Sequence, residues 1–262
     1  MDALPAAQAK EYVDSLYRKV AQRWQERVRE GEFMQRFAAG TLPREVLALF
    51  FKNWGAYTIE INTIVASTYH KYVHFFKQHP DLMAAMGEKI SDEFLHPKPP
   101  GHVLIMLQTA EALGVTREEV CAQPLLAEFR GKLDFARAVL YEGTAAEWFS
   151  LNCGEEMIGY WAGECFQILT TKYGLTPEQA IYFSKHEEAD LEEHDEGVMG
   201  HGQFNRACLQ RLIETGQGWE RPTYGMEYCA LTFIDLHGLL LKSTLDAARR
   251  QQLIPGPSEI AV

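Results

Sequence analysis

The positions of the prolines constrain the fold more than any other feature of this sequence. Eleven prolines divide the 262 residues, and proline-free stretches of 36, 52, 44 and 32 residues lie between them. Proline is strongly excluded from helix interiors, so long helices can run in these stretches. Three breaks also combine a glycine suited to end one helix with a threonine suited to begin the next: Gly40 with Thr41, Gly114 with Thr116, and Gly174 with Thr176.

Apolar side chains recur at helical spacing, and no clean alternation typical of strands is found. One stripe consists of Trp148, Leu151, Glu155, Ile158, Ala162, Cys165 and Leu169. We predict helices over about 7–29, 44–78, 81–94, 101–113, 125–142, 145–173, 177–198 (extending to about 214) and 221–251. No linker divides the chain. The sequence therefore predicts a single all-α domain of seven to eight helices over residues 1–253, followed by a flexible tail at 254–262.

The composition of the chain limits the kinds of molecule that it is expected to bind. Lys and Arg number 25 against 36 Asp and Glu, and the formal net charge of −11 disfavours nucleic acid and anionic membranes as partners. No stretch of about 20 apolar residues is present, so we expect no membrane span. The five cysteines show no close pairing, which indicates reduced thiols and a cytoplasmic protein.

Three features depart from the helical pattern. Glu155 lies on an apolar stripe, where a carboxylate must be neutralised, hydrogen-bonded or bound to a cation, and an arginine or the backbone is the partner expected in a purely structural role. The segment from His186 to Gly197 holds seven acidic residues and no Lys or Arg, and His186, Asp190 and Glu193 share one helix face. In the segment from Asp92 to His102, prolines end one helix near Glu93 and allow another to begin near His102. Such a break can direct a carboxylate and an imidazole toward the same point.

Each feature also has a structural interpretation: a paired buried glutamate, a solvated acidic face, and an exposed proline-rich loop. Together, however, carboxylates and imidazoles from three helices form the ligand set of a di-metal centre in a helical core. Such donors suit iron or manganese. The charges of Glu93, Glu155, Asp190 and Glu193 sum to −4, which two divalent cations would balance.

Three segments resemble the heme-oxygenase-like di-iron oxidases and oxygenases, relatives of TenA and PqqC that include the chlamydial death-domain-associating protein. They are Asp92-Glu93 with His102 and the segment 112–116, Glu155 with Glu164 and Tyr173-Gly174, and the segment 182–190. The resemblance implies a heme-oxygenase-like helical bundle, two iron ions per chain with manganese as an alternative, O2 as co-substrate, and a homodimer. It also implies metal ligation by Glu93, His102, Glu155, His186 and Asp190.

The sixth ligand departs from the family pattern H-x3-D-x2-H, because Glu193 stands where the family has its last histidine and His194 follows one residue later. A π-bulge after Asp190 would bring His194 to the metal. We favour His194 and keep Glu193 as the alternative.

The function implied is oxidation of a small amino-acid-like or carboxylate metabolite in an apolar cavity, for which Tyr57, Tyr160 and Trp161 are candidate lining residues. The tyrosine and lysine that the chlamydial relative consumes align with Met34 and Cys165, so we do not expect chemistry that consumes the protein's own side chains. The alternatives are a metal-free TenA-like aminopyrimidine hydrolase, with Cys153 and Glu227 as its candidate residues, a PqqC-like oxidase, and a non-catalytic binding protein.

Overall fold

The computed structural model describes residues 3–96, 101–122, 124–191, 199–217 and 222–256, and every regular element in these ranges is helical. The prediction of an all-α fold is therefore confirmed. The α-helices are α1 (Ala6–Trp24), α2 (Glu32–Ala38), α3 (Arg44–Lys71), α4 (Val73–Gln78), α5 (Pro80–Phe94), α6 (Gly101–Ala112), α7 (Arg117–Ala122), α8 (Ala127–Glu142), α9 (Ala145–Leu151), α10 (Glu155–Lys172), α11 (Ile181–Leu191), α12 (His201–Thr215) and α13 (Met226–Arg250).

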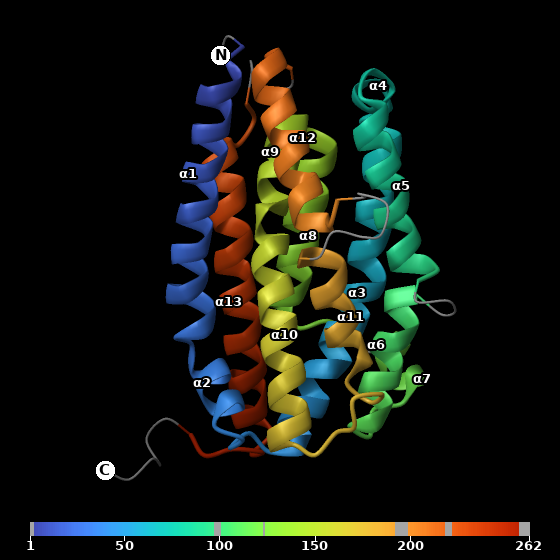
Figure 1. The fold of residues 1–262 in the computed structure, drawn as a ribbon. Helices are drawn as coiled ribbons and strands as arrows, with labels where there is room; N and C mark the ends of the chain where they lie inside the picture. Colours follow the sequence, from blue (N-terminus) through green and yellow to red (C-terminus); the bar gives the residue numbers. More distant parts are fainter. Residues whose placement is uncertain (1–2, 97–100, 123, 192–198, 218–221, 257–262) are drawn as a thin grey trace.

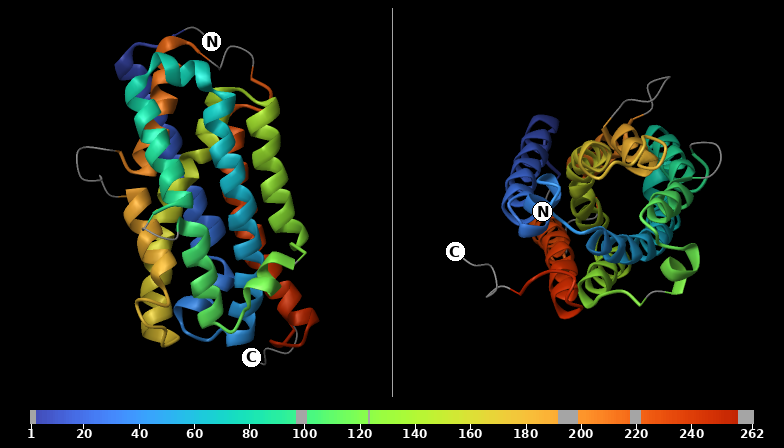
Figure 2. Two further views of the ribbon diagram at one scale, coloured as in Figure 1. Left: turned by 90° about the vertical axis from the view of Figure 1, so that its right-hand side faces the viewer. Right: turned by 90° about the horizontal axis from the view of Figure 1, so that it is seen from below.

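The long helices run roughly along one axis, with α1 and α13 side by side at one edge of the bundle and α4, α5 and α6 at the opposite edge (Figure 1). Seen along that axis, α3, α6, α11 and α10 surround a common interior (Figure 2). Their contacts agree with this view, because α10 packs on α11, α11 on α6, and α6 on α3. Side chains from these four helices can therefore meet inside the bundle.

All three glycines at the glycine–threonine breaks have positive φ angles, and α3 begins at Arg44 as predicted, but α11 begins at Ile181 and not at 177. Gly114 and Gly174 have positive φ angles of +83° and +70°, a backbone conformation that glycine adopts without a steric penalty. Thr116 and Glu119 then exchange side-chain and backbone hydrogen bonds in the manner of a capping box. At the third break Thr41 caps nothing: its hydroxyl donates to the Arg36 carbonyl oxygen, and Pro43 occupies the N-cap of α3.

Two of the predicted long helices are interrupted. The helix expected over 44–78 breaks at Tyr72, which separates α3 from α4. The helix expected over 145–173 contains a 3₁₀ turn, Asn152–Gly154, between α9 and α10. At this turn Gly154 lies directly against α13, since a Cβ there would come within 2.9 Å of the Ile234 Cδ1 atom. The close approach of a distant helix is not visible in local periodicity.

The prediction of one helix from 177 to 198, extending to 214, is wrong. The first helix, α11, begins only at Ile181, and a separate helix, α12, begins at His201 after the N-cap residue Gly200. Two short helices, α2 and α7, and a π-helical turn at Gln25–Arg29 were not expected. Within the described ranges, none of the helices combines the length and the apolar character needed to cross a membrane.

Candidate metal centre

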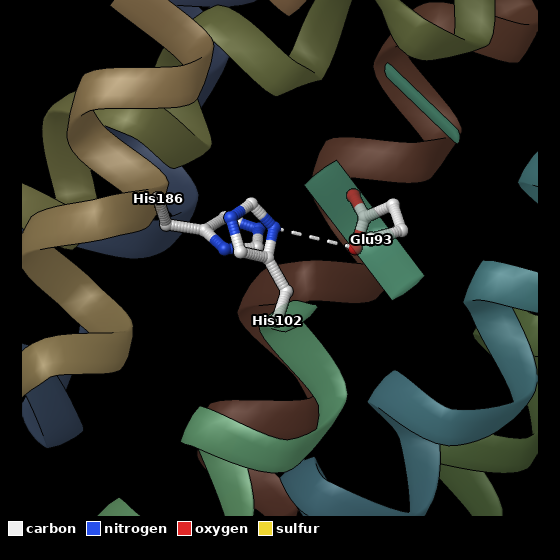
Figure 3. A group of neighbouring side chains, drawn as sticks. All are labelled: Glu93, His102 and His186. Carbon is white, nitrogen blue, oxygen red and sulfur yellow. Dashed lines mark ion pairs between the residues drawn. The ribbon is translucent and has the colours of Figure 1, made fainter. Parts of the chain in front are cut away.

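Three of the predicted ligands meet inside the bundle. Glu93 ends α5, His102 lies in the first turn of α6, and His186 projects from α11 (Figure 3). One ligand atom from each residue lies within 4.8 Å of the other two. Donors bound tetrahedrally to one ion at about 2.1 Å are about 3.4 Å apart, so the side chains would have to close in by up to about 1.4 Å to bind a single ion.

Neighbouring side chains fix the orientation of this group. The Asn62 side chain on α3 donates a hydrogen bond of 2.7 Å to the Glu93 Oε2 atom. The His186 ring packs against the Tyr182 ring one turn earlier, at a centroid separation of 4.7 Å. It also lies against the His102 ring, with centroids 4.5 Å apart. Partners of this kind hold metal ligands in place in known metal sites.

The two imidazoles leave nitrogen atoms without hydrogen bonds. The Nδ1 atoms of His102 and His186 are buried and have no hydrogen-bond partner in the described part of the chain. His102 Nδ1 lies 3.4 Å from Glu93 Oε2 as an ion pair. Buried polar atoms in proteins are nearly always satisfied, so two such nitrogens in one buried group require an explanation. A bound cation would satisfy both, and the donor set therefore fits a metal ion.

The electrostatics favour the protonation states that metal binding requires. Burial and the nearby His102 together lower the pKa of His186 to about 4, so the imidazole is neutral at pH 7. Burial by itself would raise the pKa of Glu93, but the adjacent imidazoles of His102, His186 and His201 outweigh it and hold that pKa well below its usual range. A neutral imidazole and an ionised carboxylate are the forms that coordinate a metal.

A glycine face on α10 lets α11 approach closely enough to deliver its ligands. A Cβ at Gly159 would lie 2.7 Å from the Asp190 Cβ atom, and one at Gly163 would lie 2.1 Å from the Glu187 Oε1 atom. A side chain at Gly159 would therefore push α11 away, whereas one at Gly163 would require the end of the Glu187 side chain to move. The spacing of four residues places both glycines on one side of α10, which is the side that faces α11.

Glu155, the predicted ligand on the apolar stripe of α10, is offset by a cation within the protein. The buried Lys89 ammonium on α5 forms an ion pair with Glu155, and the Asn205 side chain of α12 donates to the same carboxylate oxygen, Oε2. The sequence left two alternatives for Glu155, a carboxylate paired within the protein and a metal ligand. The structure contains a charged partner for Glu155, as the first alternative requires. It is a lysine and not an arginine.

Asp190 is held by a histidine that sequence analysis missed. The His201 Nδ1 atom lies 3.0 Å from Asp190 Oδ1, and its Nε2 atom lies 3.1 Å from Asp92 Oδ2. Burial and Lys89 each lower the pKa of His201, but the hydrogen bonds to the two aspartates outweigh them and raise it to about 9. His201 is therefore a buried cation between two carboxylates.

The missed residues had weak sequence signals. Lys89 precedes Glu93 by four residues and so lies on the same face of α5. Gly202 follows His201, and a Cβ there would lie 3.1 Å from the Asp190 backbone oxygen, so the glycine permits the approach of α12 to α11.

Glu193 and His194, the alternative sixth ligands, lie outside the described residues. In the described part of the chain, Glu93, His102 and His186 form the one group of three possible donors whose ligand atoms all lie within 4.8 Å of one another.

A cavity of about 60 Å³ connects the two groups of charged residues. Its walls include Glu93, His186, Glu155, Asp190 and His201, together with apolar side chains. Of the three aromatic residues expected to line it, Tyr57 does so. Tyr160 does not, because it is 57% exposed on the surface, and Trp161 is packed in the aromatic core against Trp54 and Phe50.

The candidate residues of the metal-free hydrolase are placed differently. The Cys153 thiol is fully buried and donates to the Phe149 carbonyl oxygen at 3.6 Å, and burial raises its pKa to about 12. Glu227 is half exposed and pairs with Lys19 at 2.5 Å. A thiol in this environment is predominantly protonated at pH 7, whereas nucleophilic cysteines are activated by a lowered pKa.

No protein-family model matches this sequence, and no curated protein matches it. Solved structures do. A TenA homologue from Pseudomonas syringae pv. tomato matches with a TM-score of 0.68 at 13% identity, over 94% of this chain and 99% of that one. A domain of unknown function with a heme oxygenase-like fold from Shewanella denitrificans matches with a TM-score of 0.67 at 15% identity, over 95% and 98%. A TenA family transcription regulator from Silicibacter sp. gives 0.61 at 13%, over 88% and 95%.

At these identities the similarity concerns the fold. The chain has a heme oxygenase-like fold of the kind found in TenA-family structures, as the sequence resemblance predicted. The assignment to di-iron oxidases stays a prediction.

Proposed function

We propose that this protein is a metal-dependent oxidoreductase that uses O2 to oxidise a small metabolite, and that Glu93, His102 and His186 hold its metal. The observation that carries the proposal is the convergence of Glu93, His102 and His186, whose ligand atoms lie within 4.8 Å of one another, while the Nδ1 atoms of both imidazoles have no hydrogen-bond partner in the described residues. Two histidines and one carboxylate with open positions are the ligand set of non-heme iron oxygenases.

Bound iron would supply the O2 and electron-transfer chemistry that protein side chains lack. The chain's own residues would orient and shield it. Asn62 holds the Glu93 carboxylate, and the Tyr182 ring fixes the His186 imidazole. Apolar cavity walls such as Trp54, Val65 and Ile158 limit the entry of water. Glu155 and Asp190 remain predicted ligands of a second metal. In the structure Glu155 pairs with Lys89, and Asp190 pairs with His201.

The dimensions of the cavity bear on the substrate. A volume of about 60 Å³ holds only a few water molecules. A larger substrate therefore requires apolar side chains at the cavity wall to move, and Ile61 and Ile158 are partly exposed wall residues where this can occur. We accordingly propose a small amino-acid-like or carboxylate metabolite rather than an extended lipid.

The test loads the apo protein with Fe(II) under anaerobic conditions, measures bound iron, and then adds O2 while recording visible absorbance. We expect iron to bind and a transient absorbance to form. His186→Ala should lose both, and His70→Ala, which removes an exposed histidine, should behave as the unaltered protein. Failure of the unaltered protein to bind iron, or a His186→Ala variant with full iron content and oxygen reactivity, would contradict the proposal. In the first case, aminopyrimidine hydrolysis that is lost in Cys153→Ser would favour the TenA-like alternative.

A further inference from the structure

A buried lysine that pairs with a residue of the cavity wall is not used by the proposed function. Lys89 on α5 is 4% exposed, and its ammonium pairs with Glu155, which lines the same cavity as Glu93 and His186. Burying an unpaired ammonium in a helical bundle is costly, so its position beside a carboxylate is required for the fold. What needs explanation is why a buried lysine is paired with Glu155, a residue of the cavity wall.

The position of Lys89 follows from its spacing on α5. It precedes Glu93 by four residues, so both side chains leave the helix on the same face, one turn apart. Glu93 reaches the His102 and His186 imidazoles, and Lys89 reaches Glu155 on α10. A single helix thus brings one metal donor to the cavity wall and one positive charge to Glu155, another residue of the same wall.

The Glu155 carboxylate is already engaged by protein donors. Lys89 Nζ and Asn205 Nδ2 both donate to its Oε2 atom. For Glu155 to bind a metal through that oxygen, both hydrogen bonds must break. The ion would then lie next to a buried ammonium, and the two positive charges would repel each other strongly in a site with little water.

Resting on the proposed function, we propose that the Lys89 ammonium takes the place of a second metal ion, so that the centre holds one metal per chain, bound by Glu93, His102 and His186. Glu155 is then the counter-ion of Lys89 and not a ligand. This differs from the two metals that the family resemblance implies, and the difference rests on the ion pair between Lys89 and Glu155.

Metal stoichiometry tests the proposal without an activity assay. Apo protein is titrated anaerobically with Fe(II) and, separately, with Mn(II), and bound metal is counted after desalting. Electron paramagnetic resonance of the Mn(II) form distinguishes an isolated ion from an exchange-coupled pair. We expect one metal and an isolated Mn(II) signal in the unaltered protein. Lys89→Ala, which removes the charge and opens space beside Glu155, should bind two and give a coupled signal. Lys77→Ala, which removes an exposed lysine on α4, should bind one.

The outcomes separate this inference from the proposed function. No bound metal in the unaltered protein overturns both. Two metals in the unaltered protein overturn the role of Lys89 and leave the proposed function intact. One metal in both the unaltered protein and Lys89→Ala also overturns the role of Lys89.

A second variant guards against misfolding of Lys89→Ala. The double variant Lys89→Met/Glu155→Gln removes both charges at nearly constant volume, a replacement that buried ion pairs often tolerate. It should keep one metal, with affinity within about threefold of the unaltered protein. An affinity more than about tenfold weaker would identify Glu155 as a ligand and overturn the inference.

Discussion

The two ends of the cavity differ in whether their buried polar groups have partners within the protein. At the first, which we term the triad end, Glu93, His102 and His186 converge, and two imidazole nitrogens lack hydrogen-bond partners among the described residues. At the second, the paired end, Glu155 and Asp190 are held by Lys89 and His201. Both ends have similar residue types, and both are buried.

The difference indicates which end is built for stability and which for a ligand. An unsatisfied buried donor or acceptor costs folding free energy and persists where function needs it, whereas a paired charge network satisfies the fold by itself. The acidic and imidazole content of a cavity is therefore a poor guide to its metal content. What distinguishes the two ends is whether the protein already provides the opposite charge.

The largest expected effect on stability comes from breaking the paired end. His201→Ala leaves Asp92 and Asp190 buried without their cation, and removal of one partner from a buried charge network typically costs about 3–5 kcal/mol. We expect the free energy of unfolding of the apo protein to fall by about 4 kcal/mol, measured by urea denaturation.

The matched change at the triad end is His186→Ala. Because His186 Nδ1 makes no hydrogen bond in the described structure, its loss should cost the apo protein less stability than His201→Ala, while abolishing metal binding. If both variants lose equal stability, the contrast between the two ends does not hold.

The next effect is the pH dependence of apo stability. The pKa of His201 is about 9 in the folded protein, above its ordinary value of 6.5. A raised histidine pKa stabilises the fold fully below about pH 6.5, and this stabilisation is lost as the pH rises through 9, by roughly 3 kcal/mol. Urea denaturation between pH 6 and 10 should show this decline, and the variant His201→Ala should lack it.

The triad end should show the opposite slope. The pKa of His186 is lowered to about 4, so the unfolded chain takes up a proton on this residue between pH 6.5 and 4 while the folded chain does not. Its contribution to stability is lost as the pH falls through that range, and His186→Ala should reduce the acid-side decline. An unchanged acid-side decline in this variant would contradict the assignment.

The smallest of these effects concerns Asn62. Its side chain donates to Glu93 Oε2 at 2.7 Å, and loss of a residue that orients a metal ligand typically weakens metal affinity by about 10- to 100-fold. Asn62→Leu should therefore weaken binding in this range without changing the number of metals bound. The neighbouring exposed residue offers a control, Thr63→Ala, which should leave the affinity unchanged.

Much of the fold was predictable because helices leave local signals. Proline-free stretches, the glycines at 114 and 174, and the capping residues Thr116 and Glu119 all mark boundaries within a few residues. The errors fall where a distant element interferes, as at Gly154, which lies against α13. Separation of α11 from α12 was also missed, and with it the position of His201.

The sequence by itself determined an all-helical chain, because helical spacing is a local property. With the family resemblance it also indicated a wider set of candidate ligands that included Glu93, His102 and His186. Only the tertiary structure decided that Lys89 and Asn205 meet Glu155, and that His201 joins Asp92 to Asp190. These contacts connect α5, α10, α11 and α12, and the packing of separate helices sets which side chains meet. Which carboxylates stay free to bind a cation is therefore a property of the assembled bundle.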